Sequence, residues 1–121
     1  IKNDILKHLT NKSGLNSYSS IIDLKPSKIK ELCFSIGAEI KNAFLILVLK
    51  DNNKAYCSCF ISKDIASSMN LNASEIISNL GSHINGKGGG QPFYATCAGD
   101  NISGVDKLIS EAKKLQKQLQ K

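Results

Sequence analysis

The sequence of 121 residues lacks tryptophan and arginine altogether, and it holds only two prolines and one methionine. All 16 of its basic residues are lysine, against 10 acidic residues, so the formal net charge is +6. Without arginine the chain has no guanidinium groups for bidentate contacts to phosphates or base edges, and its positive charge resides on mobile ammonium groups. This balance favours a phosphate-bearing or otherwise acidic partner, although it is also compatible with solubility alone.

Long hydrophobic runs are missing as well. No window approaches the run of about 20 apolar residues that a membrane-spanning helix requires, and no signal-peptide pattern opens the chain. We therefore expect a soluble, cytoplasmic protein that has no membrane partner. The first residue, Ile1, is not methionine, which suggests that the chain derives from a longer polypeptide.

Paired cysteines are also absent. The four cysteines, Cys33, Cys57, Cys59 and Cys97, lack the Cys-x-x-Cys spacing that tetrahedral zinc sites show. Cys57 and Cys59 alternate with Ser58 in a strand-like run, so we expect their side chains to share one face and to pack as small hydrophobic groups. We expect no metal site and no cofactor in this domain.

Neither histidine indicates catalysis. His8 lies in the first predicted helix, and His83 lies just before a glycine-rich segment. No nucleophile or carboxylate is spaced with either of them in the manner of a triad. We therefore expect no catalytic residue in this chain.

Alternating helical and strand-like patterns indicate one compact domain, as suits a chain of 121 residues with 41% hydrophobic content. Apolar residues at helical spacing predict helices over residues 2–11, 26–40, 72–84 and 105–119. Strands are predicted over residues 18–24, 43–49, 55–61 and 93–98. The fold class is therefore α/β or α+β, with a single mixed β-sheet covered by helices and a glycine-rich loop between a helix and a late strand.

Local features sharpen this prediction. The uninterrupted apolar run 43–49 is typical of a strand covered on both faces, and residues 51–54 favour a hairpin turn. Gly37, inside a predicted helix, indicates a close approach to a neighbouring backbone. Asn72 and Glu75 have the spacing of a capping box at the start of a helix.

The segment from Gly86 to Pro92, with the sequence Gly-Lys-Gly-Gly-Gly-Gln-Pro, is the least ordinary part of the chain. Three consecutive glycines cost much backbone entropy on folding, so we expect something to approach this backbone closely. Successive N–H groups can form an anion nest, to which Lys87 would add positive charge. The segment lacks the pattern of a P-loop or of a dinucleotide fold, and a tight helix-to-strand connection is the alternative interpretation.

Three motifs together resemble the C-terminal domain of alanyl-tRNA synthetases: Ser62-Lys63-Asp64, the glycine-rich segment, and Ala95-x-Cys97-Ala98-Gly99. The resemblance implies that residues 15–121 form a globular RNA-binding domain and that residues 1–14 are the end of a linker or oligomerisation helix. Such a domain binds the outer corner of an alanine-accepting tRNA and helps aminoacylation and editing act on one tRNA. ATP, magnesium and zinc would serve the parent enzyme elsewhere.

The resemblance and the charge pattern together predict the RNA contacts Lys87, Gly88, Gly89, Gly90, Gln91, Tyr94, Lys113 and Lys117. The glycine backbone is the main expected contact, because Gln91 stands where related proteins carry a basic residue or His, although Gln can still bond to a base edge or ribose. Phe93 or Tyr94 would supply a stacking ring, and only one of these strand neighbours is expected to be exposed. Lys113 and Lys117 lie on the polar side of the final helix, where a merely solvated face is the alternative.

Two other functions are open. The same fold accompanies DHH-type phosphoesterases, so the chain would be the substrate-binding domain of an enzyme acting on oligonucleotides. That enzyme would need an Asp-His-His metal motif, which the chain lacks. Alternatively, the first and last helices pair with those of a second subunit in a homodimer. The expected partners are tRNA, other domains of the parent synthetase and, in the last case, a second copy.

Overall fold

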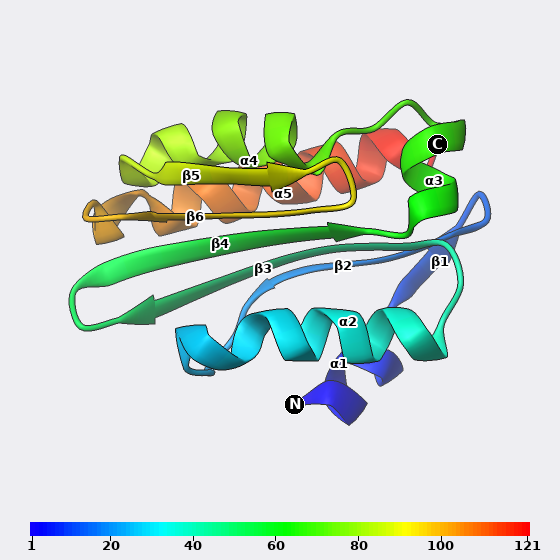
Figure 1. Cartoon of the computed structure of the whole chain (residues 1–121), viewed down its shortest axis with the longest axis horizontal. Coiled ribbons are helices and arrows are strands. Elements are labelled where there is room, and N and C mark those ends of the chain that lie inside the picture. The colour runs from blue at the N-terminus through cyan, green and yellow to red at the C-terminus, as the bar shows by residue number, and fades with distance from the viewer.

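The computed structural model describes residues 1–121. It contains a six-stranded mixed β-sheet with helices on both faces (Figure 1). The strands lie in the order β1-β2-β3-β4-β6-β5. Their bounds are Thr10–Lys12 (β1), Leu15–Ile21 (β2), Ala43–Asp51 (β3), Lys54–Ile61 (β4), Lys87–Gln91 (β5) and Tyr94–Gly99 (β6). The helices are Lys2–Lys7 (α1), Ile29–Glu39 (α2), Lys63–Ser68 (α3), Ala73–Gly81 (α4) and Val105–Leu119 (α5), and short 3-10 turns cover Pro26–Lys28, Ser82–Ile84 and Ile102–Gly104. The predicted fold class is confirmed.

β3 lies inside the sheet and is buried on both faces, as its apolar sequence predicts. It pairs in parallel with β2 and antiparallel with β4. Every residue from Ala43 to Leu49 is at most 1% exposed. The turn between β3 and β4 holds Asn52 and Asn53 at φ 49° and 63°, the left-handed conformation that favours a two-residue hairpin. The predicted hairpin is therefore confirmed.

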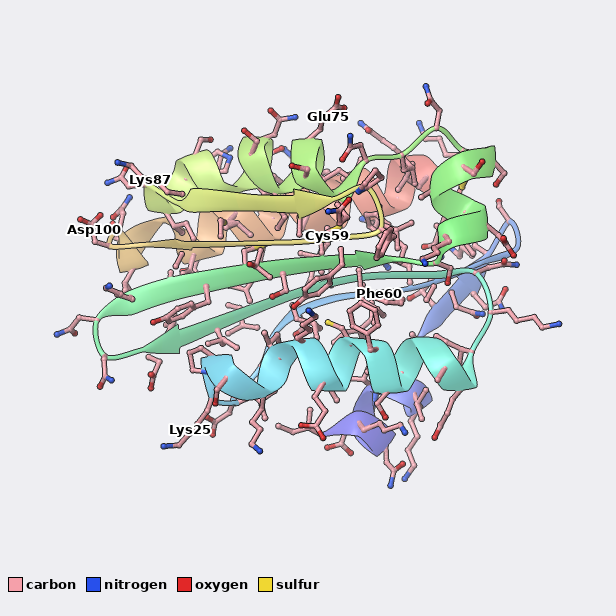
Figure 2. All side chains as sticks on the ribbon, viewed as in Figure 1. Lys25, Cys59, Phe60, Glu75, Lys87 and Asp100 are labelled. Carbon is pink, nitrogen blue, oxygen red and sulfur yellow. The ribbon has the colours of Figure 1, made fainter.

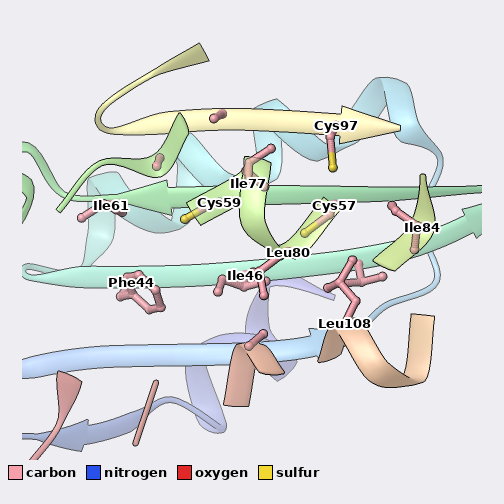
Figure 3. Close-up of a cluster of buried hydrophobic side chains, with 14 of the residues drawn as sticks. Phe44, Ile46, Cys57, Cys59, Ile61, Ile77, Leu80, Ile84, Cys97 and Leu108 are labelled. Carbon is pink, nitrogen blue, oxygen red and sulfur yellow. The ribbon is translucent and has the colours of Figure 1, made fainter. Parts of the chain in front are cut away.

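Two hydrophobic cores flank the sheet. The larger core lies under α4 and α5 and includes Cys57, Cys59 and Cys97 (Figure 3). The smaller core lies under α1 and α2 and includes Cys33 and Ile36. All four cysteines are free and buried, and the hydrophobic packing predicted for Cys57 and Cys59 is confirmed.

Gly37 makes the close approach expected of it, but its neighbour is an aromatic ring and not a backbone. A Cβ atom at this position would lie 2.6 Å from Cε2 of Phe60, so any other residue would collide with that ring. Phe34 packs edge-on against the same ring, with centroids 5.2 Å apart. This aromatic contact sets how closely α2 approaches β4.

The N-terminal helix is shorter than predicted. α1 ends at Lys7, and Thr10–Lys12 forms the edge strand β1, antiparallel to β2. Ser13 and Gly14 make the turn of the hairpin between β1 and β2, with φ 55° and 77°. Two-residue turns of this kind match the twist of antiparallel strands, so the turn chemistry overrides the helical spacing of the preceding apolar residues.

The glycine-rich segment differs from the prediction because most of it is a strand and not a loop. Residues Lys87–Gln91 form β5, which pairs antiparallel with β6 at the edge of the sheet. Asn85, at φ 55°, turns the chain into this strand. Glycine has a low strand propensity, so only the tertiary pairing with β6 explains this conformation.

α4 and α5 cover the larger core. α4 begins where the sequence predicts, with Ser74 N donating a hydrogen bond to Asn72 Oδ1 at 2.9 Å. α5 ends beside the first hairpin, where Gln120 Nε2 donates to the carbonyl oxygens of Thr10 and Leu15 at 2.7 and 2.9 Å. The buried side chain of Gln120 therefore ties the last helix to the start of the sheet.

Candidate nucleic-acid interface

β5 presents a strand almost without side chains at the edge of the sheet, and all of its residues are exposed. A Cβ atom on Gly88 or Gly90 would lie 2.8 Å from a Cα atom of β6 and closer still to a carbonyl oxygen, so these two glycines let β5 lie against β6. For Gly89 the nearest heavy atom would be Ser74 Oγ at 3.6 Å, an ordinary contact distance. Packing therefore requires the first and third glycines, whereas the position of Gly89 has room for a side chain on the side of α4.

A groove of about 590 Å³ runs beside β5 on the α2 side of the sheet. The smaller core under α2 is built mainly on β3 and β4, with Tyr94 of β6 at its border, so the rest of the face that β6 and β5 form is left open (Figure 1). Ser58, Thr96 and Ala98 lie along the floor of the groove, the segment 87–89 lies on one side, and Pro26 lies on the other. The floor thus offers polar groups, and the glycine wall offers bare backbone.

Lys87 supplies positive charge at the rim of this groove. The ion pairs of the structure all involve other lysines, which leaves Lys87 unpaired. Asp100 lies at the same end of β5 and β6 (Figure 2), and its carboxylate accepts a hydrogen bond from Asn85 Nδ2 at 3.3 Å. The ammonium group of Lys87 is therefore available for a phosphate, the kind of contact that dominates affinity for nucleic acids.

Tyr94 does not have the exposed ring expected of a stacking residue. Its ring packs edge-on against Phe34, with centroids 5.3 Å apart, and belongs to the border of the smaller core. Its hydroxyl group is buried, and this burial raises the pKa of Tyr94 to about 12. This packing favours Phe93 over Tyr94 as the stacking ring, and the RNA contact of Tyr94 stays a prediction.

Lys63, which is not among the predicted RNA contacts, lies over the ring of Phe93, one of the two predicted stacking residues. Lys63 Nζ lies 4.6 Å from the centroid of the half-buried Phe93 ring. Both residues line a hollow of about 490 Å³, together with Pro92 and Asn72. The only signal in the sequence is the place of Lys63 in the Ser62-Lys63-Asp64 motif, because the distance along the chain hides its contact with the ring.

Lys113 and Lys117 do not join the surface around β5. They lie on the second half of α5 and line a different groove, which follows β2. β2 and β5 are separated by β3, β4 and β6, so the two strands are about 19 Å apart at the usual strand spacing. The predicted RNA contacts therefore fall into two groups, one near each edge of the sheet.

No cluster of three or more His, Cys, Asp or Glu residues has a geometry that would hold a metal ion. Cys57 and Cys97 lie opposite each other on β4 and β6, and the hydrogen bond with Cys97, together with burial, raises the pKa of the Cys57 thiol. Burial raises the pKa of Cys33 to about 12. Cys57 and Cys33 are thus neutral thiols, which are poor nucleophiles.

The sequence matches the family model of the DHHA1 domain over residues 17–118. The chain therefore belongs to the DHHA1 domain family, in agreement with the resemblance carried by its glycine-rich segment. Among curated proteins it is similar to the alanine–tRNA ligases of Christiangramia forsetii, at 40% identity over 108 residues, and of Flavobacterium psychrophilum, at 34% over 112 residues. These matches cover 88% and 93% of this chain but 12% and 13% of the ligases, so the chain spans about an eighth of their length.

A solved structure with the same fold is the C-Ala domain from Aquifex aeolicus alanyl-tRNA synthetase. It superposes with a TM-score of 0.74 at 19% sequence identity, covering 88% of this chain and 95% of that domain. At this identity the likeness shows the fold alone. Separately, none of the helices combines the length and apolar character needed to cross a membrane.

Proposed function

We propose that the chain is the tRNA-binding C-terminal domain of an alanine–tRNA ligase and that it contacts tRNA through β5 and the adjoining groove. The similarity to curated ligases favours this assignment over the substrate-binding domain of a phosphoesterase. The observation that carries the contact surface is Gly89: its exposed backbone has room for a side chain, lies between two glycines that packing requires, and follows closely on the unpaired Lys87.

The outer corner of tRNA has chemistry that suits this surface. Proteins read RNA mainly through shape, unstacked or end-stacked bases, the 2′-hydroxyl groups and phosphates. A backbone without side chains can approach a flat base face closely, while Lys87 reaches a phosphate. Gln91, exposed at the end of β5, can both donate and accept hydrogen bonds with a base edge or ribose. Lys63 adds a second cation near that end of the strand.

In the parent enzyme this domain would hold one tRNA while aminoacylation and editing act on its acceptor end in turn. A contact far from the reacting end raises the effective concentration of that end at both catalytic sites, without any catalytic group in the domain itself. The division of labour is consistent with a chain that spans about an eighth of its curated relatives.

The substitution Gly89→Val tests the contact surface. Valine favours strands, and its Cβ atom would meet no backbone atom, so thermal stability should be retained while the added side chain covers part of the exposed strand. Filter binding with alanine tRNA at low salt should show an affinity at least about tenfold lower, as expected when a close contact in the centre of an interface is blocked. Asn11→Val, on the edge strand β1, adds the same side chain to the opposite edge and should leave the affinity unchanged.

Two outcomes would contradict the proposal in different ways. If Gly89→Val is stable and binds tRNA as tightly as the unaltered chain, then β5 is not the contact surface. If the unaltered chain itself shows no salt-sensitive affinity for tRNA, then RNA binding is not its function, because phosphate contacts are strongest at low salt.

A further inference from the structure

The edge of the sheet farthest from β5 is partly open, and the proposed RNA contact does not use it. β1 pairs only with the first part of β2, and its last partner there is Ser17. Beyond that point β2 continues to Ile21 with β3 on one side and no strand on the other (Figure 1). Open strand edges are sites where a further strand can pair.

The hydrogen bonds to β3 identify which backbone groups of β2 are free. Asn16 N and Ile22 N both donate to carbonyl oxygens on the β3 side at 2.8 Å. Because successive residues of a strand alternate in direction, the backbone groups of Ser19 and Ile21 point to the open side. Ser19 therefore offers a free N–H and a free C=O there, and Ile21 offers a free N–H.

Two buried hydroxyl groups lie along the same edge. Ser17 and Ser19 are 0% and 7% exposed, and neither Oγ atom has a hydrogen-bond partner. Both residues line a groove of about 540 Å³ that runs between α1 and α5. Buried hydroxyl groups are nearly always paired in folded proteins, so two unpaired ones beside a groove indicate a ligand that accepts hydrogen bonds.

The charges around the groove are unequal on its two sides. Lys113 and Lys117 line it from α5, and neither is in an ion pair, whereas the neighbouring Lys114 pairs with Glu111. On the α1 side the groove has one carboxylate, Asp4, next to His8, and no lysine. An occupant would therefore place carboxylates toward α5 and neutral side chains toward α1.

Both donors and acceptors are free at this edge, and this favours a peptide over a phosphate group. The carbonyl oxygen of Ser19 carries partial negative charge and would repel an anion. An extended peptide backbone instead presents donors and acceptors in alternation, which can pair with both free groups. Side chains on alternate residues of such a peptide would share the face of Ser17, Ser19 and the two lysines.

We propose that the open edge of β2 binds an extended acidic peptide segment as an additional strand, with carboxylates on alternate residues directed at Lys113 and Lys117. The hydroxyl groups of Ser17 and Ser19 donate to those carboxylates, and the backbone of Ser19 and Ile21 completes the pairing. This surface faces away from β5, so it serves a protein partner and leaves the RNA contact free.

The test uses the 121-residue chain and a short synthetic peptide that alternates glutamate with valine. Amide hydrogen exchange, followed residue by residue by NMR, should slow at least about tenfold at Ser19 and Ile21 on peptide binding, because these N–H groups become paired. The same peptide with lysine in place of glutamate should produce no such protection.

A double variant examines the charges. Lys113→Glu with Lys117→Glu should weaken binding of the glutamate peptide at least about tenfold, because two attractive contacts become repulsive. Lys50→Glu with Lys54→Glu, on the β3–β4 hairpin, makes the same change in net charge and should leave peptide binding unaltered.

Three results would overturn the proposal: no protection at Ser19 and Ile21, equal binding of the lysine peptide, or equal loss from both double variants. A further result would also overturn it and would assign the groove to RNA. In that case Lys113→Glu with Lys117→Glu would weaken alanine tRNA binding as much as Lys87→Glu does, while the peptide would not bind.

Discussion

The two edges of the sheet differ in their side chains and in their surroundings. At β5 the edge is made of glycines that lack side chains, with the single charge of Lys87 at one end and a groove on the α2 side. At β2 the open edge lies in a groove between α1 and α5. The hydroxyl groups of Ser17 and Ser19 and the side chains of Lys113 and Lys117 line this groove. The first arrangement admits a large flat surface, whereas the second admits only a narrow extended chain. The two proposed recognition surfaces lie at different edges of the sheet, so their ligands would not compete.

The largest effect expected from this comparison concerns Gly88. In the substitution Gly88→Val the Cβ atom would collide with the backbone of β6, so the folded state should lose about 3 kcal/mol of stability, in the upper range for overpacking. Urea unfolding measures the loss, and Gly89→Val is the matched control with little change. Equal destabilisation by both substitutions would show that the glycines do not differ in packing.

The next effect lies at the opposite edge. Gln120→Ala removes the two hydrogen bonds that its amide donates to Thr10 and Leu15, and it leaves their carbonyl oxygens without those donors. We expect a loss of about 2 kcal/mol in the free energy of unfolding, because the Gln120 side chain is buried. Hydrogen exchange should accelerate in β1 before it does so in β5. Uniform acceleration across the sheet would contradict this local role.

The charge reversal Lys87→Glu sharpens the comparison for RNA. Its affinity for alanine tRNA should fall about tenfold at low salt, and the dependence of affinity on salt should become weaker, because one phosphate contact is lost. The double variant at Lys113 and Lys117 should bind tRNA with nearly unchanged affinity in the same filter assay. A larger effect from the double variant would place the RNA contact at the edge of β2 and would contradict the proposed contact at β5.

The smallest effect is expected for Tyr94→Phe. The hydroxyl group is buried and the ring packs on Phe34, so tRNA affinity should change by less than about twofold, as for residues outside a contact surface. Phe93→Ala, by contrast, should weaken binding if the ring beside Lys63 touches RNA. A strong effect of Tyr94→Phe on affinity would restore Tyr94 to the interface.

The fold was predictable where the signal is local. The apolar run 43–49 predicts a strand covered on both faces, and the residues Asn52 and Asn53 predict the hairpin that follows it. Both predictions depend on residues within a few positions of one another. Alternation along the chain likewise identifies the shared face of Cys57 and Cys59.

The candidate site was predictable only in part, because its remaining features depend on pairing between distant segments. The conformation of Gly88 to Gly90 is set by β6, which no local pattern of glycines reveals. The separation of Lys113 from Lys87 follows from the order of the strands, and the strand order is a non-local property. The position of Lys63 over Phe93 is hidden for the same reason.

The hydrogen bonds of Gln120 also bear on how the domain forms during translation. Its side chain completes the packing around β1, the first strand to be made, yet it is separated from Thr10 by 110 residues in sequence. The N-terminal hairpin therefore lacks these two hydrogen bonds until residue 120 is available to it. We infer that the domain reaches its final stability only after residue 120 has emerged, so a pause in synthesis before α5 is complete would leave the β2 side of the sheet exposed.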